Sequence, residues 1–240
     1  MRIGVLGCGT IASAAVRGIA QDGHVITVSR RNEEHATALA ECYANVTIAE
    51  NQGVIDASDV IFLGLAAEVA QDVLGALTFR ADQKIISFMA GATLSQADAM
   101  VKPAHAVAIM MPFPAIAQGG TPIMMHGDAD LVREIFGARN SIFPLRSAEE
   151  MAAYLCAQAV LSPLARMIED AASWLGAAGA DRAQGEAFLR ALVTSSLAKS
   201  ECGPLIEALN TPGGYNQRLR QHMETQGMSA ALISGLDDLS

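Results

Sequence analysis

The chain has few aromatic and few charged residues. Of its 240 residues, 5% are Phe, Trp or Tyr and 17% are Asp, Glu, Lys or Arg. The hydrophobic share is nevertheless 51%, so a sizeable core must consist mainly of aliphatic side chains. Basic residues are the scarcer charge, 16 against 25 acidic ones, which gives a net charge of −9. An acidic chain of this kind is not expected to bind nucleic acid or an anionic membrane surface.

The chain also lacks the patterns of a disulfide scaffold, a metal site and a membrane span. Its four cysteines are scattered without C-x-x-C spacing, which indicates buried free thiols in a reducing cytoplasm. Its five histidines have no metal-ligand spacing, so no bound metal is expected. No apolar stretch of about 18 residues has the character of a span, and no basic segment precedes an apolar run at the N-terminus. We therefore expect a cytoplasmic protein with no membrane partner.

The first 31 residues carry the most informative pattern in the chain. Arg2–Leu6 is apolar like a buried strand, Thr10–Ala20 has helical periodicity, and His24–Val28 is a second apolar segment. The turn Gly7-Cys8-Gly9-Thr10-Ile11-Ala12 fits the pattern G-x-G-x-x-G/A. A strand, a tight turn, a helix and a second strand in this order predict a dinucleotide-binding site. The alternative is a glycine-rich turn in another doubly wound protein.

Each residue of this turn has a physical task in such a site. Gly7 permits the turn, Gly9 lets the backbone approach a pyrophosphate, and Ala12 lets the helix pack closely on the strand. The pyrophosphate then lies on N–H groups at the start of the helix, those of Thr10 and Ile11 among them, at the positive end of the helix dipole.

The residues after the second strand predict which dinucleotide binds. An NAD site usually has an acidic residue about 20 residues after the glycines, where it binds the ribose 2′-hydroxyl. Ser29, Arg30 and Arg31 occupy that place, so a hydroxyl and two guanidinium groups are available to a 2′-phosphate and no carboxylate repels it. We therefore predict NADP(H) as the cofactor. The alternative is that one arginine is a solvated charge before a helix capped by Asn32.

Alternating strands and helices continue to about residue 146. Apolar segments predict strands at 60–65, 84–89, 104–111, 121–126 and 142–145, helices at 33–43 and 69–77, and a capping box that opens another helix at Thr93. This alternation predicts an α/β fold, with a Rossmann-type, doubly wound parallel sheet in residues 1–146.

Residues 147–240 carry helix-forming sequence and nothing with the pattern of a strand. A capping box at Ser147–Glu150 opens a helix from about Glu149 to Leu175 that is apolar on more than one face. In a small helical domain, such a helix is expected to bury its surface against a second subunit. We therefore predict an all-helical C-terminal dimerisation and substrate domain, in a homodimer or a higher multiple of dimers.

Several further segments form a pattern that covers nearly the whole chain. They are Ile3–Gly9 with Ala12 and Gly18, Glu50-Asn51 before Ala57–Val60, Ile85–Gly91, Met111-Pro112 with Pro114-Ala115 and Gly119, and Thr211-Pro212-Gly213-Gly214 with Ala230–Ile233. Together they resemble the pyrroline-5-carboxylate reductase family, and the Thr-Pro-Gly-Gly segment is the most specific of them.

The resemblance implies an enzyme that transfers a hydride from NADPH to the C=N bond of a small cyclic imine carboxylate, as in proline biosynthesis. It also implies a dimer with intertwined C-terminal helices. Further cofactor contacts are implied at Asn51 for adenosine and at Met89, Ala90 and Gly91 for the nicotinamide, with Leu65 and Ala66 as additional cofactor-binding residues.

The resemblance places the substrate pocket at Met111, Pro112, Phe113, Gly213 and Gly214, with Tyr215 and Asn216 as candidate catalytic residues. Here the chain departs from the family. Phe113 alone stands where the family has an Asn-Thr pair, and Asn216 stands at the position of a family threonine.

Alternatives remain open for these substrate residues and for the function. The amides of Gly213 and Gly214 hold a substrate carboxylate, or the glycines merely precede a helix. Tyr215 hydrogen-bonds the substrate and donates a proton, or it packs in the subunit interface. The alternative functions are an NADPH-dependent reductase of another imine or a keto substrate, and a non-catalytic NADP-binding protein.

Overall fold

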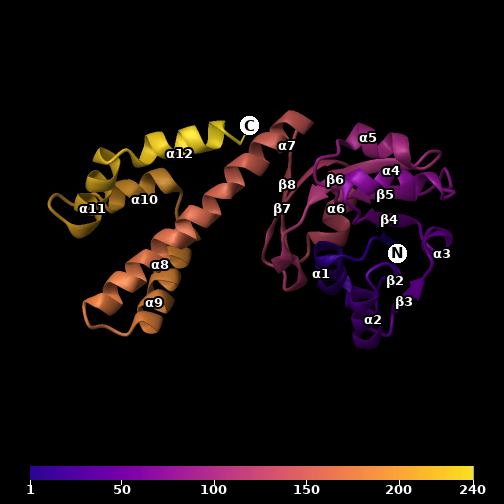
Figure 1. Cartoon of the computed structure of the whole chain (residues 1–240), viewed down its shortest axis with the longest axis horizontal. Helices are drawn as coiled ribbons and strands as arrows, with labels where there is room; N and C mark the ends of the chain where they lie inside the picture. The colour runs from indigo at the N-terminus through magenta and orange to yellow at the C-terminus, as the bar shows by residue number, and fades with distance from the viewer. Residues whose placement is uncertain (240) are drawn as a thin grey trace. The chain divides into compact units, whose positions relative to one another are not determined.

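The computed structural model describes residues 1–239 and divides the chain into two compact units (Figure 1). The first unit is Met1–Met151 and the second is Ala152–Ser240. The sequence placed the boundary at residue 146, whereas the division falls inside helix α7 (Ala148–Ala157). Ser240, the last residue of the predicted second domain, lies outside the described residues.

The first unit is built on one eight-stranded sheet with the order β3-β2-β1-β4-β5-β6-β7-β8. The strands are β1 (Arg2–Leu6), β2 (Val25–Ser29), β3 (Val46–Ala49), β4 (Val60–Leu63), β5 (Lys84–Ser87), β6 (His105–Met111), β7 (Pro122–Gly127) and β8 (Ser141–Pro144). The first six are parallel, as a Rossmann-type sheet requires. The Rossmann-type α/β fold that we expected is therefore confirmed.

A parallel arrangement of all strands was wrong for the last two. β7 runs antiparallel to β6, and β8 runs parallel to β7. The chain between β6 and β7 holds only the short 3-10 helix η1 (Pro114–Ala117). A parallel return needs a crossover of a dozen or more residues, usually with a full helix, so this short connection reverses the chain instead.

Helices cover both faces of the sheet. They are α1 (Thr10–Ile19), α2 (Glu33–Cys42), α3 (Asn51–Asp56), α4 (Ala67–Gly75), α5 (Leu94–Met100) and α6 (Ala129–Phe136). One buried cluster contains side chains of α1, α2 and α6, and the other contains side chains of α3, α4 and α5. Successive residues of β4 alternate between them, with Phe62 in the first cluster and Ile61 and Leu63 in the second. β3, α3 and α6 are short elements that were not expected from the sequence.

The two predicted capping boxes differ in the structure. At α5 the box is complete, because the Thr93 hydroxyl accepts from the Gln96 N–H at 3.2 Å and the Gln96 side chain accepts from the Thr93 N–H at 2.7 Å. At α7 only half of it forms. The Ser147 hydroxyl accepts from the Glu150 N–H, but the Glu150 carboxylate accepts from the Arg146 N–H and side chain. These bonds from Arg146 hold the pKa of Glu150 below its ordinary value.

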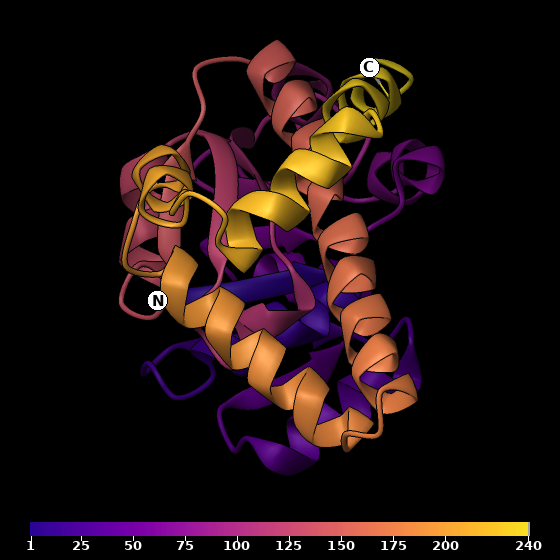
Figure 2. The same ribbon diagram turned by 90° about the vertical axis from the view of Figure 1, so that its left-hand side faces the viewer.

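The second unit consists of helices throughout its described residues. After α7 come the 3-10 turn η2 (Gln158–Val160), α8 (Leu161–Ala177), α9 (Arg182–Leu197), α10 (Cys202–Ala208), α11 (Tyr215–Thr225) and α12 (Met228–Asp237). α8 and α9 are joined by a short turn at Gly179; they contact each other near this turn and diverge away from it (Figure 2).

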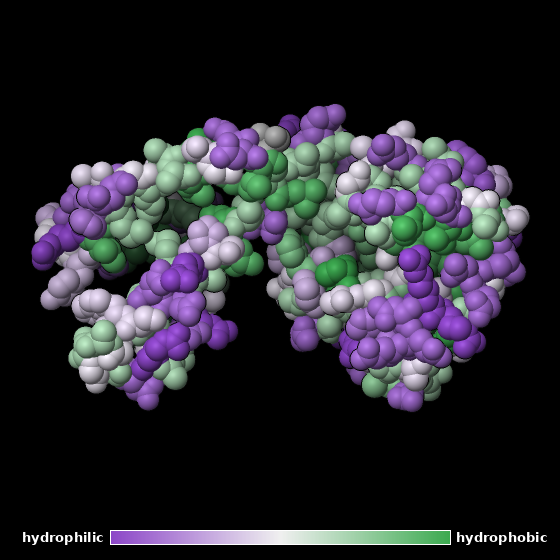
Figure 3. All heavy atoms as spheres, viewed as in Figure 1, coloured by the Kyte–Doolittle hydropathy of each residue, from purple (hydrophilic) through white to green (hydrophobic). Residues whose placement is uncertain are grey.

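The second unit has almost no core of its own. Of its described residues only Ala172 is buried. Large apolar side chains are exposed instead, with Leu161 at 64% and Trp174 at 69% of their full accessible surface. Figure 3 shows apolar residues, in green, among the surface atoms of this unit. A soluble protein rarely exposes so much apolar surface without a partner for it.

We expected no apolar stretch of about 18 uncharged residues with the character of a membrane span, and one helix comes close to this limit although it contains charged residues. Ala148–Ala177 is a continuous run of 30 helical residues that by length and composition is apolar enough to cross a membrane. Only 6% of the apolar 18-residue stretch within this helix is buried inside the single chain. A helix that packs against a second subunit meets the same criterion, so this property by itself does not indicate a membrane.

Candidate cofactor-binding site

The carboxyl ends of the six parallel strands meet at one edge of the sheet. The strand order reverses at β1, which has β2 on one side and β4 on the other. Ligands of open α/β sheets bind outside the carboxyl ends of the strands at such a reversal. The loops at this edge begin at Gly7 after β1, Arg30 after β2, Glu50 after β3, Gly64 after β4 and Phe88 after β5.

The glycine turn after β1 has the geometry of a phosphate-binding turn. Gly7 has a φ of +85°, a conformation that residues with a side chain rarely adopt. Gly9 is extended with a φ of −79°, and a Cβ built on it would meet no atom within 4 Å. The first intrahelical bond runs from the Ser13 N–H to the Gly9 carbonyl, so the N–H groups of Thr10 and Ile11 precede the ladder. The backbone at Gly9 therefore faces open space beside unsatisfied helical donors.

The cysteine inside this turn has an uncharged thiol. Cys8 is fully buried, and burial raises the pKa of its thiol to about 11. The thiol therefore stays neutral and adds no negative charge beside a pyrophosphate. The expectation of buried free thiols holds for Cys8 but is wrong for Cys42 and Cys202, which are exposed.

Ser29 does not present its hydroxyl to a ligand. We expected this hydroxyl to help bind a 2′-phosphate. In the structure Ser29 is fully buried, and its Oγ accepts a hydrogen bond of 2.9 Å from the Gly7 N–H. Ser29 thus ties the end of β2 to the glycine turn, and its buried hydroxyl is not exposed to a ligand.

Arg30 and Arg31 are both exposed at the end of β2. Arg30 donates through Nε to Oε1 of Glu50 at 2.9 Å. Within residues 1–239 the structure gives the Arg31 side chain no hydrogen bond or ion pair. Asn32 follows with a φ of +68° and precedes α2 as expected, but its side chain makes no capping bond.

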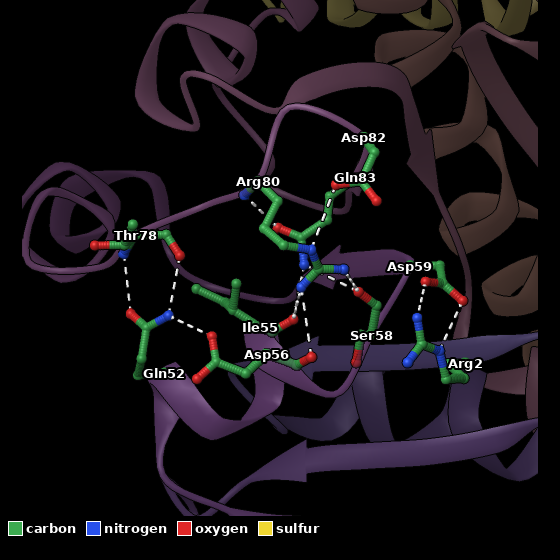
Figure 4. Close-up of polar contacts among 10 residues, drawn as sticks. All are labelled: Arg2, Gln52, Ile55, Asp56, Ser58, Asp59, Thr78, Arg80, Asp82 and Gln83. Carbon is green, nitrogen blue, oxygen red and sulfur yellow. Dashed lines mark hydrogen bonds and ion pairs between the residues drawn. The ribbon is translucent and has the colours of Figure 1, made fainter.

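Asn51, the residue implied to contact adenosine, opens the short helix α3. The far end of α3 is held by side chains from the segment before β5 (Figure 4). Gln83, which is buried, donates to the carbonyls of Ile55 at 2.7 Å and Ser58 at 2.9 Å, and Arg80 also donates to Ser58. Cationic and amide donors at these carbonyls satisfy the groups that the end of a helix leaves unpaired.

The same network reaches the first turn of α3. The Gln52 side chain exchanges two hydrogen bonds with the backbone of Thr78, each 2.9 Å long (Figure 4). It also donates to Asp56 at 2.8 Å. The helix is thereby held at both ends, which fixes the place of Asn51 and of Glu50 before it.

The predicted cofactor contacts after β4 and β5 divide into supporting and exposed residues. Leu65 and Met89 are buried, and they belong to the core beneath the edge. Ala66, Ala90 and Gly91 are exposed at the ends of β4 and β5, where a ligand has access to them.

Met111, Pro112 and Phe113 follow the end of β6, the strand next to β5. Met111 and Pro112 are buried and Phe113 is half-buried. η1, which follows this loop, packs closely on α1, where a Cβ on Gly18 would lie only 2.4 Å from the Ile116 carbonyl oxygen. The absence of a side chain at Gly18 therefore lets η1 lie directly against α1.

The turn before α11 uses the amides that we expected to bind a substrate. The Gly213 N–H donates to Oε1 of Gln217 at 2.8 Å, and the Gly214 N–H donates to the Thr211 carbonyl at 2.9 Å. Both glycine amides are thus engaged within their own turn, which favours the alternative that these glycines merely precede a helix. Gln217 was not expected from the sequence to take part in this turn, and its side chain stabilises the turn further by a hydrogen bond to Asn210.

Within the described residues, the backbone N–H groups without a partner in this turn belong to the residues that follow Gly214. The first intrahelical bond of α11 runs from the Arg218 N–H to the Gly214 carbonyl, so the N–H groups of Tyr215 and Asn216 precede the helical ladder. Both side chains are exposed, and Tyr215 retains 90% of its accessible surface. The start of α11 can therefore accept an anion on backbone donors, with an amide and a phenol beside it.

Known proteins resemble the chain in sequence over only part of its length. Residues 2–91 match the family described as NADP oxidoreductase, coenzyme F420-dependent. Pyrroline-5-carboxylate reductase 2 of Bacillus subtilis (strain 168) is 28% identical over 99 residues, which cover 39% of this chain and 36% of that protein. The aligned part is thus little more than a third of that protein's length.

Solved structures resemble the chain over a longer stretch. The 1-pyrroline-5-carboxylate reductase of Streptococcus pyogenes has a TM-score of 0.83 at 24% identity, over 100% of this chain and 96% of that one. A Plasmodium falciparum pyrroline carboxylate reductase with NADP bound has a TM-score of 0.81 at 15% identity, over 100% and 95%. An imine reductase from Pseudomonas sp. has a TM-score of 0.66 at 20% identity, over 98% and 87%. The resemblance inferred from the sequence is therefore confirmed at the level of the fold: the chain has the fold of the pyrroline-5-carboxylate reductases over its whole length, and residues 2–91 match the NADP oxidoreductase family.

Proposed function

We propose that this chain is an NADPH-dependent reductase that transfers a hydride to the C=N bond of a small cyclic imine carboxylate of the pyrroline-5-carboxylate type. The observation that carries the proposal is the edge at Gly9, where open space, helical N–H donors and two arginines lie around the strand reversal. The NADP-bound structure with the same fold supports the choice of cofactor.

The residues present at this edge fit NADP(H). Gly7, Gly9, Thr10, Ile11 and Ala12 would hold the pyrophosphate at the start of α1. Arg30 and Arg31 would bind the 2′-phosphate, and Asn51 the adenosine. On the nicotinamide side, Ala66, Ala90 and Gly91 would contact the ring, with Leu65 and Met89 as its support. When bound, the cofactor supplies the hydride.

Reduction of an imine makes small demands on the protein's acids and bases. A protonated imine is already an electrophile, so the residues mainly have to orient the substrate and exclude water. We assign the substrate carboxylate to the N–H groups of Tyr215 and Asn216 at the start of α11, because the amides of Gly213 and Gly214 have partners. The Asn216 side chain would fix the substrate, and Tyr215 would donate a hydrogen bond or a proton.

Met111, Pro112 and Phe113 would form an apolar wall of the pocket. Phe113 replaces polar residues of the family, so it favours substrates with a more apolar ring than pyrroline-5-carboxylate. An NADPH-dependent reductase of another imine or of a keto substrate is therefore the second candidate, and the likeness to an imine reductase agrees with it. A non-catalytic NADP-binding protein is the third.

NADPH oxidation measured against a panel of cyclic imines and 2-keto acids separates these candidates. Turnover of cyclic imine carboxylates supports the proposal, and turnover of keto acids alone supports the second candidate. Tight NADPH binding with no turnover on the whole panel points to the non-catalytic protein.

We also propose that the chain acts in the cytoplasm as a homodimer or a multiple of it. The assembly is proposed because the second unit cannot bury its own apolar surface. Its helices leave an apolar hollow of about 760 Å³, lined among others by Pro163, Met167, Met223, Leu232 and Leu236. A second copy of the same unit presents the same unburied apolar helices, so the two copies can bury this surface against each other.

The cofactor assignment predicts that NADPH binds at least about tenfold more tightly than NADH. A charge-assisted hydrogen bond to phosphate contributes about 1.5–3 kcal/mol, which corresponds to a tenfold or greater ratio of dissociation constants. Fluorescence titration of the parent and of an Arg30→Ala/Arg31→Ala double variant measures the ratio. The variant should bind both cofactors alike. An unchanged ratio in the variant would contradict the assignment.

The substrate assignment predicts that Asn216→Ala lowers kcat/KM by roughly tenfold or more on any active substrate, because a substrate-orienting bond is lost. The affinity for NADPH should stay at the parent value, since Asn216 does not belong to the cofactor edge. Gln221→Ala, an exposed change further along α11, serves as the control and should leave both quantities unchanged. Parent-like kinetics of Asn216→Ala would place the substrate elsewhere.

A further inference from the structure

Arg30 and Glu50 lie side by side because of the pairing between two neighbouring strands. β2 and β3 are parallel, with Ser29 opposite Ala49 in the register. The Arg30 N–H donates to the Ala49 carbonyl at 3.1 Å, which continues the pairing by one residue beyond β2. Arg30 and Glu50 are therefore the first residues to leave the sheet at adjacent strand ends, and their side chains meet there.

The contact between them uses one side of the guanidinium only. Arg30 Nε donates to Glu50 Oε1 at 2.9 Å, and no bond from either terminal nitrogen of Arg30 is formed within the described chain. A guanidinium binds phosphate best through two parallel N–H donors. A carboxylate on Nε leaves such a pair of donors available and restricts the directions in which they point.

Glu50 is itself well placed to hold this orientation. It precedes α3, and its carboxylate makes no capping bond to that helix. α3 is anchored by Gln83 at its carbonyl end and by Gln52 in its first turn (Figure 4). The backbone that carries Glu50 is thus anchored, and the Glu50 carboxylate contacts Arg30 from this anchored position. Within the described chain, Arg31 has no such carboxylate beside it.

We infer that Glu50 is a positioning residue for cofactor selection: it holds Arg30 through Nε so that the terminal nitrogens of the guanidinium face the 2′-phosphate of NADPH. The inference rests on the proposed use of NADPH. The opposite effect of a carboxylate at this place is repulsion of the phosphate, and the two effects predict opposite results for the same substitution.

The test compares Glu50→Ala and Glu50→Gln in the full-length protein, with dissociation constants for NADPH and NADH measured by fluorescence titration. Glu50→Ala removes the acceptor for Arg30 Nε and should weaken NADPH binding about two- to fivefold, the size expected for one exposed ion pair. Glu50→Gln keeps an oxygen acceptor and should bind NADPH at least as tightly as the parent. NADH, which has no 2′-phosphate, should bind all three proteins alike.

Glu33→Ala is the matched control. Glu33 is an exposed carboxylate in the first turn of α2, close in sequence to Arg30 and Arg31, and no bond joins it to either. Its removal should not weaken NADPH binding. The inference is overturned if Glu50→Ala binds NADPH as tightly as the parent or more tightly, or if Glu50→Gln loses as much affinity as Glu50→Ala. A parent protein without preference for NADPH would instead overturn the cofactor proposal, before any variant is considered.

Discussion

Gly9→Ala is expected to weaken NADPH binding by about 10- to 100-fold while the protein stays as stable as the parent. A methyl group at this position fills the space that the pyrophosphate needs, and overpacking of this kind costs about 1–3 kcal/mol. In the absence of cofactor the methyl group meets nothing within 4 Å, and the φ of −79° suits alanine. The loss of chain freedom in the unfolded state should even raise stability slightly.

Titration with NADPH and thermal unfolding of the same samples separate the two effects. Gly75→Ala is the matched control, because a Cβ at Gly75 also meets no atom within 4 Å and the residue ends α4 outside the proposed site. It should leave NADPH affinity unchanged. Parent-like NADPH binding by Gly9→Ala would show that the pyrophosphate does not lie at this turn.

Light scattering is expected to give a mass of twice the 25.1 kDa of one chain, or a multiple of that mass. Leu161 and Trp174 on α8 are mostly exposed in the single chain, and full burial of such a side chain contributes about 1.5–3 kcal/mol to association. A Leu161→Asp/Trp174→Asp double variant loses this burial and would place two carboxylates in an apolar interface. It should dissociate to monomers at concentrations where the parent remains assembled.

A concentration series by light scattering, with circular dichroism to follow helix content, makes the measurement. Val25→Asp is the control, because Val25 is an exposed apolar residue of the other unit at 56% accessibility. It should leave the mass unchanged. A parent protein that is monomeric at micromolar concentration would contradict the proposed assembly.

Much of the cofactor domain was predictable because its signals are local. The turn Gly7–Ala12, the apolar runs of β1, β2, β4 and β5, and the complete capping box at Thr93 each depend on neighbours within a few residues. β3 was missed because it is an edge strand that is only partly buried, so it lacks the continuous apolar run of β4. α3 was missed because its six residues are fewer than two helical turns and carry too little periodicity to be distinguished from a loop.

The sequence by itself therefore determined the strand–turn–helix that opens the chain, the alternation that builds a Rossmann-type sheet, and the helical second half with too much apolar surface for one chain. Only the tertiary structure decided the contacts between residues far apart in the chain. It buries the Ser29 hydroxyl on Gly7 and sets Glu50 against Arg30, 20 residues away. It also reverses β7 against β6, and it decides between local partners where it engages the amides of Gly213 and Gly214 within their own turn. These outcomes depend on strand register and on competition between hydrogen-bond partners, which local periodicity does not encode.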